Sequence, residues 1–133
     1  MKSIPESHLD LLTDEKKAFL YLATTMKDGS PQVTPVWFNT DGGYILINSA
    51  EGRLKDRNMR ARPHVALCIA DPANPYRYLQ IRGKVVAFTS DGADAHIDAL
   101  SFKYTGNPVY QNHQPGQKRV IYKIMPEKVN AYG

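Results

Sequence analysis

The sequence contains little of what builds disulfide frameworks, membrane spans or exported proteins. One cysteine, Cys68, stands among 133 residues, which excludes an internal disulfide. No apolar run approaches the ~20 residues that a membrane-spanning helix needs. A secretory signal would show a basic segment followed by an apolar one, and no such pair occurs in the N-terminal stretch MKSIPESHLDLL. We therefore expect a cytoplasmic protein without membrane contacts.

Patterns for metal binding and for common catalytic groups are also absent. The four histidines are scattered, without paired spacing and without cysteine partners, so we expect no metal site built by the protein. There is no Ser-His-Asp pattern and no glycine-rich phosphate loop. Cys68 lies in an apolar run, so we expect it to pack as a small hydrophobic residue. The lack of an obvious acid, base or nucleophile fits redox chemistry, in which a cofactor carries the hydride and the protein supplies position and electrostatics.

What the sequence does contain is typical of a globular protein, since 42% of the residues are hydrophobic and 23% are charged. A chain of 133 residues fits one domain, which we assign to residues 1–133. The formal net charge of +4 suits an anionic partner. Nucleic acid, a membrane surface and a phosphorylated small molecule all meet that description, and charge does not choose among them.

Two Asp-Gly turns mark the first half of the chain. They lie in residues 27–30 (KDGS) and 40–43 (TDGG) and flank the stretch PQVTPVWFN. Such turns between apolar runs are strong signals of β-hairpins. We therefore expect a short N-terminal helix that leads into a strand at residues 19–25, and then a meander of three antiparallel strands. Pro35 lacks a backbone donor, so we expect the middle strand to be interrupted there.

Later segments predict three further strands and a helix. Residues 64–70 (HVALCIA) are apolar at both parities, as in a strand covered on both faces. Residues 76–90 alternate apolar and polar, and Gly83 interrupts them where a long strand would bend. Residues 91–104 have apolar side chains at helical intervals, and the C-terminal segment alternates again from Val120. About six mostly antiparallel strands and three short helices favour a small β-barrel with helical decoration.

The stretch EGRLKDRN places Arg53, Lys55 and Arg57 at alternate positions where a helix should begin. A helix N-terminus carries partial positive charge, so each cation there is repelled by about 0.3–1 kcal/mol unless an anion is bound. The spacing therefore predicts an anion site, although a solvated basic face is the more common fate of a charge run. On a helix, Arg53, Arg57 and Arg60 would form one stripe, and Lys55 and Arg62 would point almost opposite.

Four stretches together resemble a known family: ATTMKDGSPQVTPVWF, ILINSAEGRLKDRNMRARPHVAL, DPANPYRYLQIRGKV and HIDALSFKYTG. The sequence is similar, over nearly its whole length, to the split-barrel flavin and deazaflavin oxidoreductases of the pyridoxamine 5'-phosphate oxidase-like superfamily. The similarity is strongest to the branch of coenzyme F420-dependent enzymes. The resemblance implies a mainly β fold, an FMN-binding-like split β-barrel of six to seven strands. It also implies a homodimer with two cofactor sites at the subunit interface.

The resemblance also assigns residues to the cofactor site. The anionic end of the cofactor is expected to be held by Ser49, Arg53, Lys55, Arg57 and Asn58. First-turn N–H groups and guanidinium groups suit such an anion. The edge of the cofactor ring is expected beside the strand residues Val33, Pro35, Val36 and Trp37, for which ordinary strand packing is the alternative. Tyr76 of the partner subunit is expected to border the cofactor or the substrate, unless it only packs in the dimer interface.

We expect an oxidoreductase that uses reduced coenzyme F420 to transfer a hydride to a small conjugated organic substrate. FMN is the alternative cofactor, but it ends in one phosphate, whereas F420 carries a longer anionic tail that suits the extended basic set. Tyr76, Lys55 and water are the candidate proton donors. A flavin- or haem-binding protein without turnover is the other alternative. Single-stranded nucleic acid would need aromatic residues among the cations, and the basic stretch has none, so we expect no nucleic-acid partner.

Overall fold

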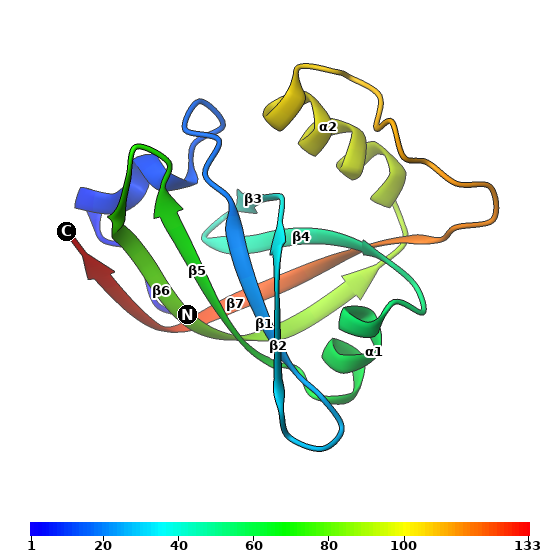
Figure 1. Ribbon diagram of the computed structural model, residues 1–133, viewed down its shortest axis with the longest axis horizontal. Helices are drawn as coiled ribbons and strands as arrows, with labels where there is room; N and C mark the ends of the chain where they lie inside the picture. Colours follow the sequence, from blue (N-terminus) through cyan, green and yellow to red (C-terminus); the bar gives the residue numbers. More distant parts are fainter.

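Seven antiparallel strands form one sheet that curls into a half-barrel in the computed structural model, which describes residues 1–133 (Figure 1). Along the chain the elements are η1 (Glu6–Leu12, a 3-10 helix), β1 (Leu20–Thr25), β2 (Pro31–Val36), β3 (Phe38–Asp41), β4 (Tyr44–Ala50), α1 (Leu54–Ala61), β5 (His64–Asp71), β6 (Asn74–Thr89), α2 (Ala93–Thr105) and β7 (Arg119–Tyr132). The strand order across the sheet is β2-β1-β5-β6-β7-β4-β3. The prediction of a mainly β split barrel with three short helices is confirmed.

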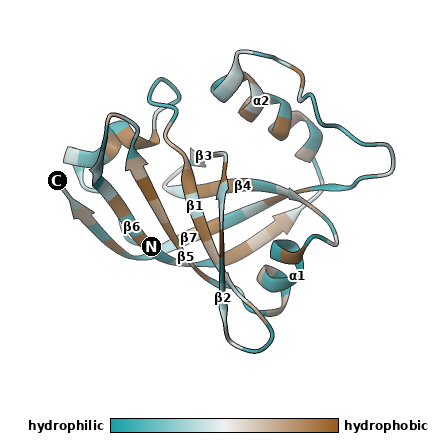
Figure 2. Ribbon diagram, viewed as in Figure 1, coloured by the Kyte–Doolittle hydropathy of each residue, from teal (hydrophilic) through white to brown (hydrophobic).

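The core lies inside the curl of the sheet, because each strand turns every second side chain toward it. A cluster of 17 buried residues forms this core, among them Leu20 of β1, Ile47 of β4, Ile69 of β5, Ile81 of β6 and Tyr122 of β7. Figure 2 shows hydrophobic residues along the strands and mostly hydrophilic loops. Burying one large apolar side chain contributes about 1.5–3 kcal/mol, so the alternation along the strands stabilises the curl.

The two Asp-Gly turns form hairpins as predicted, but the predicted meander is wrong. One turn joins β1 to β2, where Thr25 pairs with Pro31, and the other joins β3 to β4. Between β2 and β3 the chain leaves the sheet at Trp37, so these two strands lie at its opposite edges. The break comes two residues after Pro35, which pairs with Tyr21 inside β2. A proline is tolerated there because an edge strand does not need every backbone donor.

The long strand β6 bends at Gly83, as predicted. The register between β6 and β7 shifts there, and a Cβ atom on Gly83 would lie 2.6 Å from the Met125 carbonyl oxygen. Only glycine therefore lets the two strands approach so closely. The prediction that β5 is covered on both faces holds for one face only, since Ala66 and Cys68 on its other face are half-buried. The single chain supplies no second layer for that face.

The two α-helices lie against the ends of the strands. Helix α1 contacts β1 and β4, and helix α2 contacts β4 and β7. Helix α2 lies between Gly92 and Gly106, which both have positive φ, and it confirms the helix predicted for residues 91–104. Helix α1 confirms the one predicted from the basic stretch. None of these helices has the length and hydrophobicity that crossing a membrane requires.

Candidate functional site

A pocket opens where the β2–β3 junction, the first turn of α1, helix α2 and the loop before β7 come together. Its volume is about 330 Å³. It is lined by Phe19, Pro35, Val36, Trp37, Asn48, Arg53, Lys55, Ile97, Leu100, Tyr110, Asn112 and Arg119. Three of these side chains are cationic and none is acidic. The wall therefore combines apolar and aromatic surface with uncompensated positive charge.

Arg53 and Lys55 reach the pocket because of how α1 begins. Arg53 is the N-cap residue, with extended backbone angles (φ −66°, ψ 158°), and Lys55 follows in the first helical turn. The predicted stripe of Arg53, Arg57 and Arg60 is wrong, because Arg53 precedes the helical turns that would define it. Arg60 instead donates to the Asp56 carboxylate over 2.8 Å. Two of the cations in the basic stretch thus share the pocket although they are not on one helical face.

The Asp56 carboxylate fixes the first turn of α1 to the sheet. It accepts hydrogen bonds from the Gly52 backbone N–H at 2.9 Å, from the Tyr122 hydroxyl and from Arg60. Burial by itself would raise the pKa of Asp56, but these three donors outweigh it and the pKa is lowered. Asp56 is therefore ionised and occupied by donors of the protein, so it does not neutralise the cations of the pocket.

The three cations of the pocket have no acidic partner. No salt bridge within the chain involves Arg53, Lys55 or Arg119. Burial lowers the pKa of Lys55, and the charges of Arg53 and Arg119 lower it further. Arg119 is 5% exposed, and burial lowers its pKa as well. An anion bound among these groups would favour the charged forms of Lys55 and Arg119 and offset the repulsion among the three cations.

A set of hydrogen bonds connects Arg119 to helix α2 and to β3. The Arg119 Nε–H donates to Asn48 Oδ1 at 2.9 Å. Asn48 Nδ2 lies 2.9 Å from the Ala93 carbonyl oxygen and 3.1 Å from His96 Nδ1. His96 Nε2 lies 2.9 Å from Asn39 Oδ1. Burial, and after it the charge of Arg119, lowers the pKa of His96 to about 4, so the imidazole is neutral near pH 7.

Three of the four residues expected beside a cofactor ring line the pocket, namely Pro35, Val36 and Trp37. The Trp37 ring stacks on Tyr104 with 5.4 Å between centroids, and it meets Tyr110 edge-on at 6.0 Å. Helix α2 and the following loop therefore hold the indole in place. Val33 does not line the pocket, and this residue of β2 is 65% exposed.

Four other residues expected at the cofactor site do not line this pocket: Ser49, Arg57, Asn58 and Tyr76. Ser49 is buried, on the face of β4 opposite to Asn48, and its Oγ has no hydrogen-bond partner. Asn58 lies on the buried face of α1, where its Nδ2 donates to the Thr24 hydroxyl of β1 at 3.1 Å. Arg57 and Tyr76 are exposed, Tyr76 to 83%.

The sequence-based predictions missed Asn48, Tyr110 and Arg119. Asn48 comes directly before the predicted Ser49, and only the facing of β4 decides which of the two reaches the pocket. Arg119 is the first residue of β7, and the pairing of β7 with β4 places it opposite Ala50, close to the start of α1. A single arginine at the start of a strand carries no such signal, because the pairing is a property of the tertiary structure.

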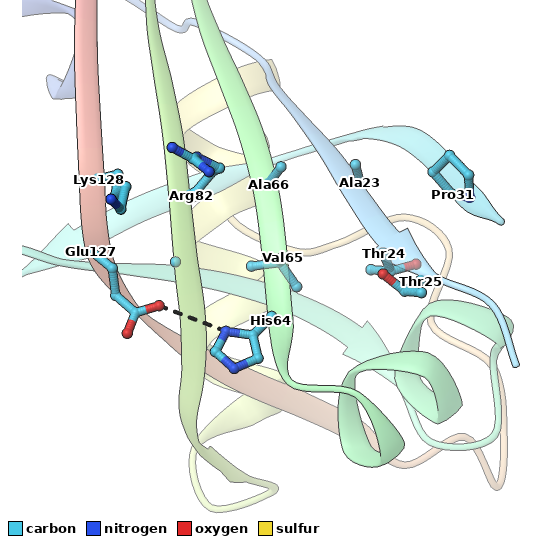
Figure 3. A pocket seen from close by; sticks show the side chains of 11 residues that line it. Ala23, Thr24, Thr25, Pro31, His64, Val65, Ala66, Arg82, Glu127 and Lys128 are labelled. Carbon is cyan, nitrogen blue, oxygen red and sulfur yellow. Dashed lines mark ion pairs between the residues drawn. The ribbon is translucent and has the colours of Figure 1, made fainter. Parts of the chain in front are cut away.

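A second hollow, of about 510 Å³, lies on the outer side of the sheet (Figure 3). Its residues come mainly from β1, β5, β6 and β7. His64 Nδ1 and Glu127 Oε1 are 3.7 Å apart in it, and Arg82 and Lys128 lie nearby in Figure 3. The charges of this hollow are therefore mixed, unlike those of the pocket beside α1.

Residues 4–133 match the pyridoxamine 5'-phosphate oxidase family. A solved structure of an F420 reductase is 35% identical to this chain, with a TM-score of 0.84, and the match covers 96% of this chain and 98% of that one. Among curated proteins, none matches the sequence significantly.

Two more distant structures share the fold. A conserved hypothetical protein from Mycobacterium tuberculosis is 20% identical with a TM-score of 0.74, over 99% of this chain and 89% of that one. HutZ, a haem storage protein from Vibrio cholerae, is 16% identical with a TM-score of 0.67, over 96% of this chain and 94% of that one. At these identities the likeness shows the fold alone.

Proposed function

Because this chain belongs to the pyridoxamine 5'-phosphate oxidase family, we propose that the pocket beside α1 binds a flavin-type cofactor by its anionic end. The cofactor we propose is coenzyme F420, and the activity is that of an oxidoreductase acting on a small conjugated organic substrate. The similarity to an F420 reductase, at 35% identity over 96% of the chain, supports this choice of cofactor.

The observation that carries the proposal is a pocket wall with three cations and no carboxylate. Arg119 is buried and Lys55 is half-buried, whereas Arg53 is exposed. Taking a charged group out of water without a partner costs several kcal/mol, and a bound anion would offset that cost for Arg119 and Lys55. A phosphate does so here, because Lys55 can donate to it and Arg53 can bind it through two parallel hydrogen bonds. Its place at the start of α1 also matches the positive end of the helix dipole.

The apolar side of the same pocket suits the ring of the cofactor. Pro35, Val36 and Trp37 lie where β2 ends, at an edge of the sheet. An edge strand leaves backbone N–H and C=O groups without partners, and these can orient a heterocycle by hydrogen bonds. When bound, coenzyme F420 supplies the hydride. The role of these residues is to hold its reacting face at a fixed distance from the acceptor, which accounts for much of the rate of such reactions.

The basic set that favours F420 over FMN differs from the one expected from the sequence. Arg60 bonds to Asp56, and Arg62 donates to the Thr25 carbonyl oxygen at 2.7 Å, so both are occupied elsewhere. Arg119 is added from β7. The three positive charges of the pocket exceed the negative charge of a single phosphate. The longer anionic tail of F420 supplies additional negative groups.

A haem-binding protein without turnover fits the pocket less well. The usual protein ligands of haem iron are histidine, cysteine, methionine and tyrosine. The pocket beside α1 contains none of the first three, and Tyr110 is its only tyrosine. Haem would also leave the three cations with only its propionates as partners.

We propose in addition that the protein is a homodimer. The outer side of β1, β2 and β5 exposes Tyr21 to 45% and Val33 to 65%, and it leaves Ala66 and Cys68 half-buried. A second copy packed on this side would bury these residues. The 83% exposed Tyr76 would then have a place in the interface or beside the cofactor of the partner subunit.

The test is a fluorescence titration of the purified protein with F420 and with FMN, for the wild type and for Lys55→Glu. We expect F420 to bind more tightly than FMN, with a preference that shrinks as salt screens the tail contacts. Lys55→Glu should weaken F420 binding at least about tenfold, since a hydrogen bond to a charged group contributes about 1.5–3 kcal/mol. The melting temperature without cofactor should be unchanged or higher, because the introduced carboxylate would face Arg53 and Arg119.

The matched control is Lys118→Glu, which makes the same charge change on a side chain that is 63% exposed. It should leave the affinity within about twofold of the wild type. Tighter binding of FMN than of F420, insensitive to salt, would refute the choice of cofactor. An F420 affinity that is unchanged in Lys55→Glu would show that the anion site lies elsewhere.

A further inference from the structure

We infer that Arg119 is a third ligand for the anionic group bound in the pocket, aimed at it by Asn48 and His96. The inference rests on the proposed function, because it concerns the same pocket. It adds a residue outside the basic stretch, about 60 positions along the chain, together with the two residues that orient it.

Arg119 is almost fully buried, yet part of its guanidinium group is unused. The residue is 5% exposed. Its Nε donates to Asn48 at 2.9 Å and its Nη1 to Gln117 at 3.4 Å, whereas Nη2 has no acceptor in the chain. Among the side-chain nitrogen and oxygen atoms that are shielded from solvent, Ser49 Oγ is the only one without a hydrogen-bond partner. Nη2 also lacks a partner but is not in that class, so it is accessible to solvent in the pocket. A buried arginine is normally paired with a carboxylate, and this one is free to pair with an anion from outside the chain.

Tyr110 limits the direction from which an anion can approach. The Arg119 guanidinium carbon lies 5.2 Å from the centroid of the Tyr110 ring. The guanidinium group therefore lies over the Tyr110 ring, while its Nε donates to Asn48. What remains is Nη2, whose N–H groups can donate to an oxygen of a phosphate or carboxylate.

The neighbours of Asn48 determine which way its amide points. The Ala93 carbonyl can only accept and the Arg119 Nε–H can only donate, so Nδ2 faces Ala93 and Oδ1 faces Arg119. The second hydrogen on Nδ2 then points to His96 Nδ1, which must accept it. His96 is thus the neutral tautomer with its proton on Nε2, and it donates to Asn39 Oδ1. The four residues form one series in which each donates to the next, from Arg119 through Asn48 and His96 to Asn39.

This series explains why arginine is needed rather than any cation. Asn48 holds Nε, and with it the plane of the guanidinium group, so Nη2 is oriented before an anion arrives. A lysine at this position would keep the charge but would lose the fixed plane and the bond from Nε. We therefore assign to Asn48 and His96 the role of positioning residues, which act on the anion through Arg119.

The experiment compares Arg119→Gln and Arg119→Lys with the control Lys118→Gln, which removes the same charge from the exposed neighbouring residue. Affinity is measured by fluorescence titration for F420 and FMN, and by calorimetry for inorganic pyrophosphate. Arg119→Gln should weaken both F420 and pyrophosphate binding about 10- to 100-fold. Arg119→Lys should recover part of that loss, and Lys118→Gln should change either affinity less than about twofold.

A second variant tests the inference with Arg119 still in place. Asn48→Asp puts a carboxylate against the guanidinium group and so gives Arg119 an acidic partner inside the protein. F420 and pyrophosphate should then bind at least about tenfold more weakly, although all three pocket cations remain. Unchanged affinities in this variant and in Arg119→Gln would overturn the inference.

The outcomes separate this inference from the proposed function. If Lys55→Glu loses F420 and Arg119→Gln does not, Arg119 is not a ligand and the proposed function stands. If the wild type binds neither F420 nor FMN, but binds pyrophosphate through Arg119, the proposed function fails and the inference stands. If Arg119→Gln dissociates a dimer and leaves both affinities unchanged, the partner of Arg119 is a carboxylate of a second copy, and the inference is refuted.

Discussion

Two adjacent residues of β4 have opposite environments. Asn48 reaches the pocket and bonds to Arg119, Ala93 and His96, while Ser49 is buried on the other face with an unpaired Oγ. Successive side chains of a strand point to opposite faces, so a shift of one residue exchanges the two roles. Which polar residue of a strand belongs to a site is therefore decided by the face that the strand turns to it.

His96 makes the stability of the protein depend on pH in a defined range. Its pKa is about 4 in the folded protein, below the ordinary value of 6.5. Between these values the unfolded chain binds more protons, so the contribution of His96 is fully present above pH 6.5 and is lost as the pH falls through about 4. The expected loss in the free energy of unfolding is about 1–2 kcal/mol for this partly buried group.

Urea unfolding of the wild type and of His96→Gln at pH 7 and at pH 4 checks this expectation. Glutamine can accept from Asn48 and donate to Asn39, but it does not titrate, so the variant should lose less stability on acidification. Asp10 does not interfere in this range, because the hydrogen bond from Arg77 lowers its pKa to about 2. The same pH dependence in both proteins would mean that His96 is not buried as a neutral group.

Helix α1 is positioned by a buried carboxylate rather than by its N-cap side chain. The N-cap residue Arg53 makes no side-chain capping bond, and its guanidinium group is left for the pocket. Asp56 instead joins the loop before the helix to β7, through Gly52 and Tyr122. The start of α1, and with it the position of Lys55, therefore depends on an element far away in the sequence.

Asp56→Asn should lower the free energy of unfolding by about 2–4 kcal/mol, because it weakens three hydrogen bonds to a buried charge and leaves Arg60 without its partner. It should also weaken F420 binding, since the first turn of α1 is no longer held. Urea denaturation and fluorescence titration measure the two effects. The matched control is Asp94→Asn in the exposed first turn of α2, expected within about ±0.5 kcal/mol. A wild-type stability in Asp56→Asn would contradict the anchoring role.

Helix α2 performs a similar task for the β2–β3 junction. The Tyr104 hydroxyl donates to the Ala18 carbonyl oxygen at 2.6 Å and accepts from the Phe38 backbone N–H at 3.4 Å, while its ring stacks on Trp37. Lys103 adds a bond to the Phe38 carbonyl oxygen at 2.7 Å. The chain leaves the sheet at Trp37, and these contacts replace the strand pairing that is interrupted there.

At the scale of the whole molecule, one side of the curled sheet is left without a covering layer. If a second copy packs there, light scattering at micromolar concentration should give a mass of about twice 14.9 kDa. Ala66→Glu should shift the protein to the monomer without changing its circular dichroism, because it places a charge in the middle of that side. The same substitution at the exposed Ala95 of α2 should leave the mass unchanged. A wild-type mass near 14.9 kDa would refute the dimer.

The local features of this protein were predictable from its sequence. Turn chemistry, alternation and helical spacing extend over a few residues, and they correctly predicted the two hairpins, the bend at Gly83, both α-helices and the mainly β class. The charge pattern of Arg53 and Lys55 also lies within a few residues, and the structure brings both side chains together in one pocket. The family resemblance, which rests on short motifs, also pointed to Pro35 and Trp37, and both line this pocket.

The pairing of distant segments was decided only by the tertiary structure. The break at Trp37 sends β2 and β3 to opposite edges of the sheet, and the pairing of β4 with β7 places Arg119 opposite Ala50. Neither follows from the residues near it, because the register of two strands about 70 residues apart is set by how all the buried side chains pack together. The pocket therefore combines cations that the sequence marks at the start of α1 with an arginine that only the packed sheet brings beside them.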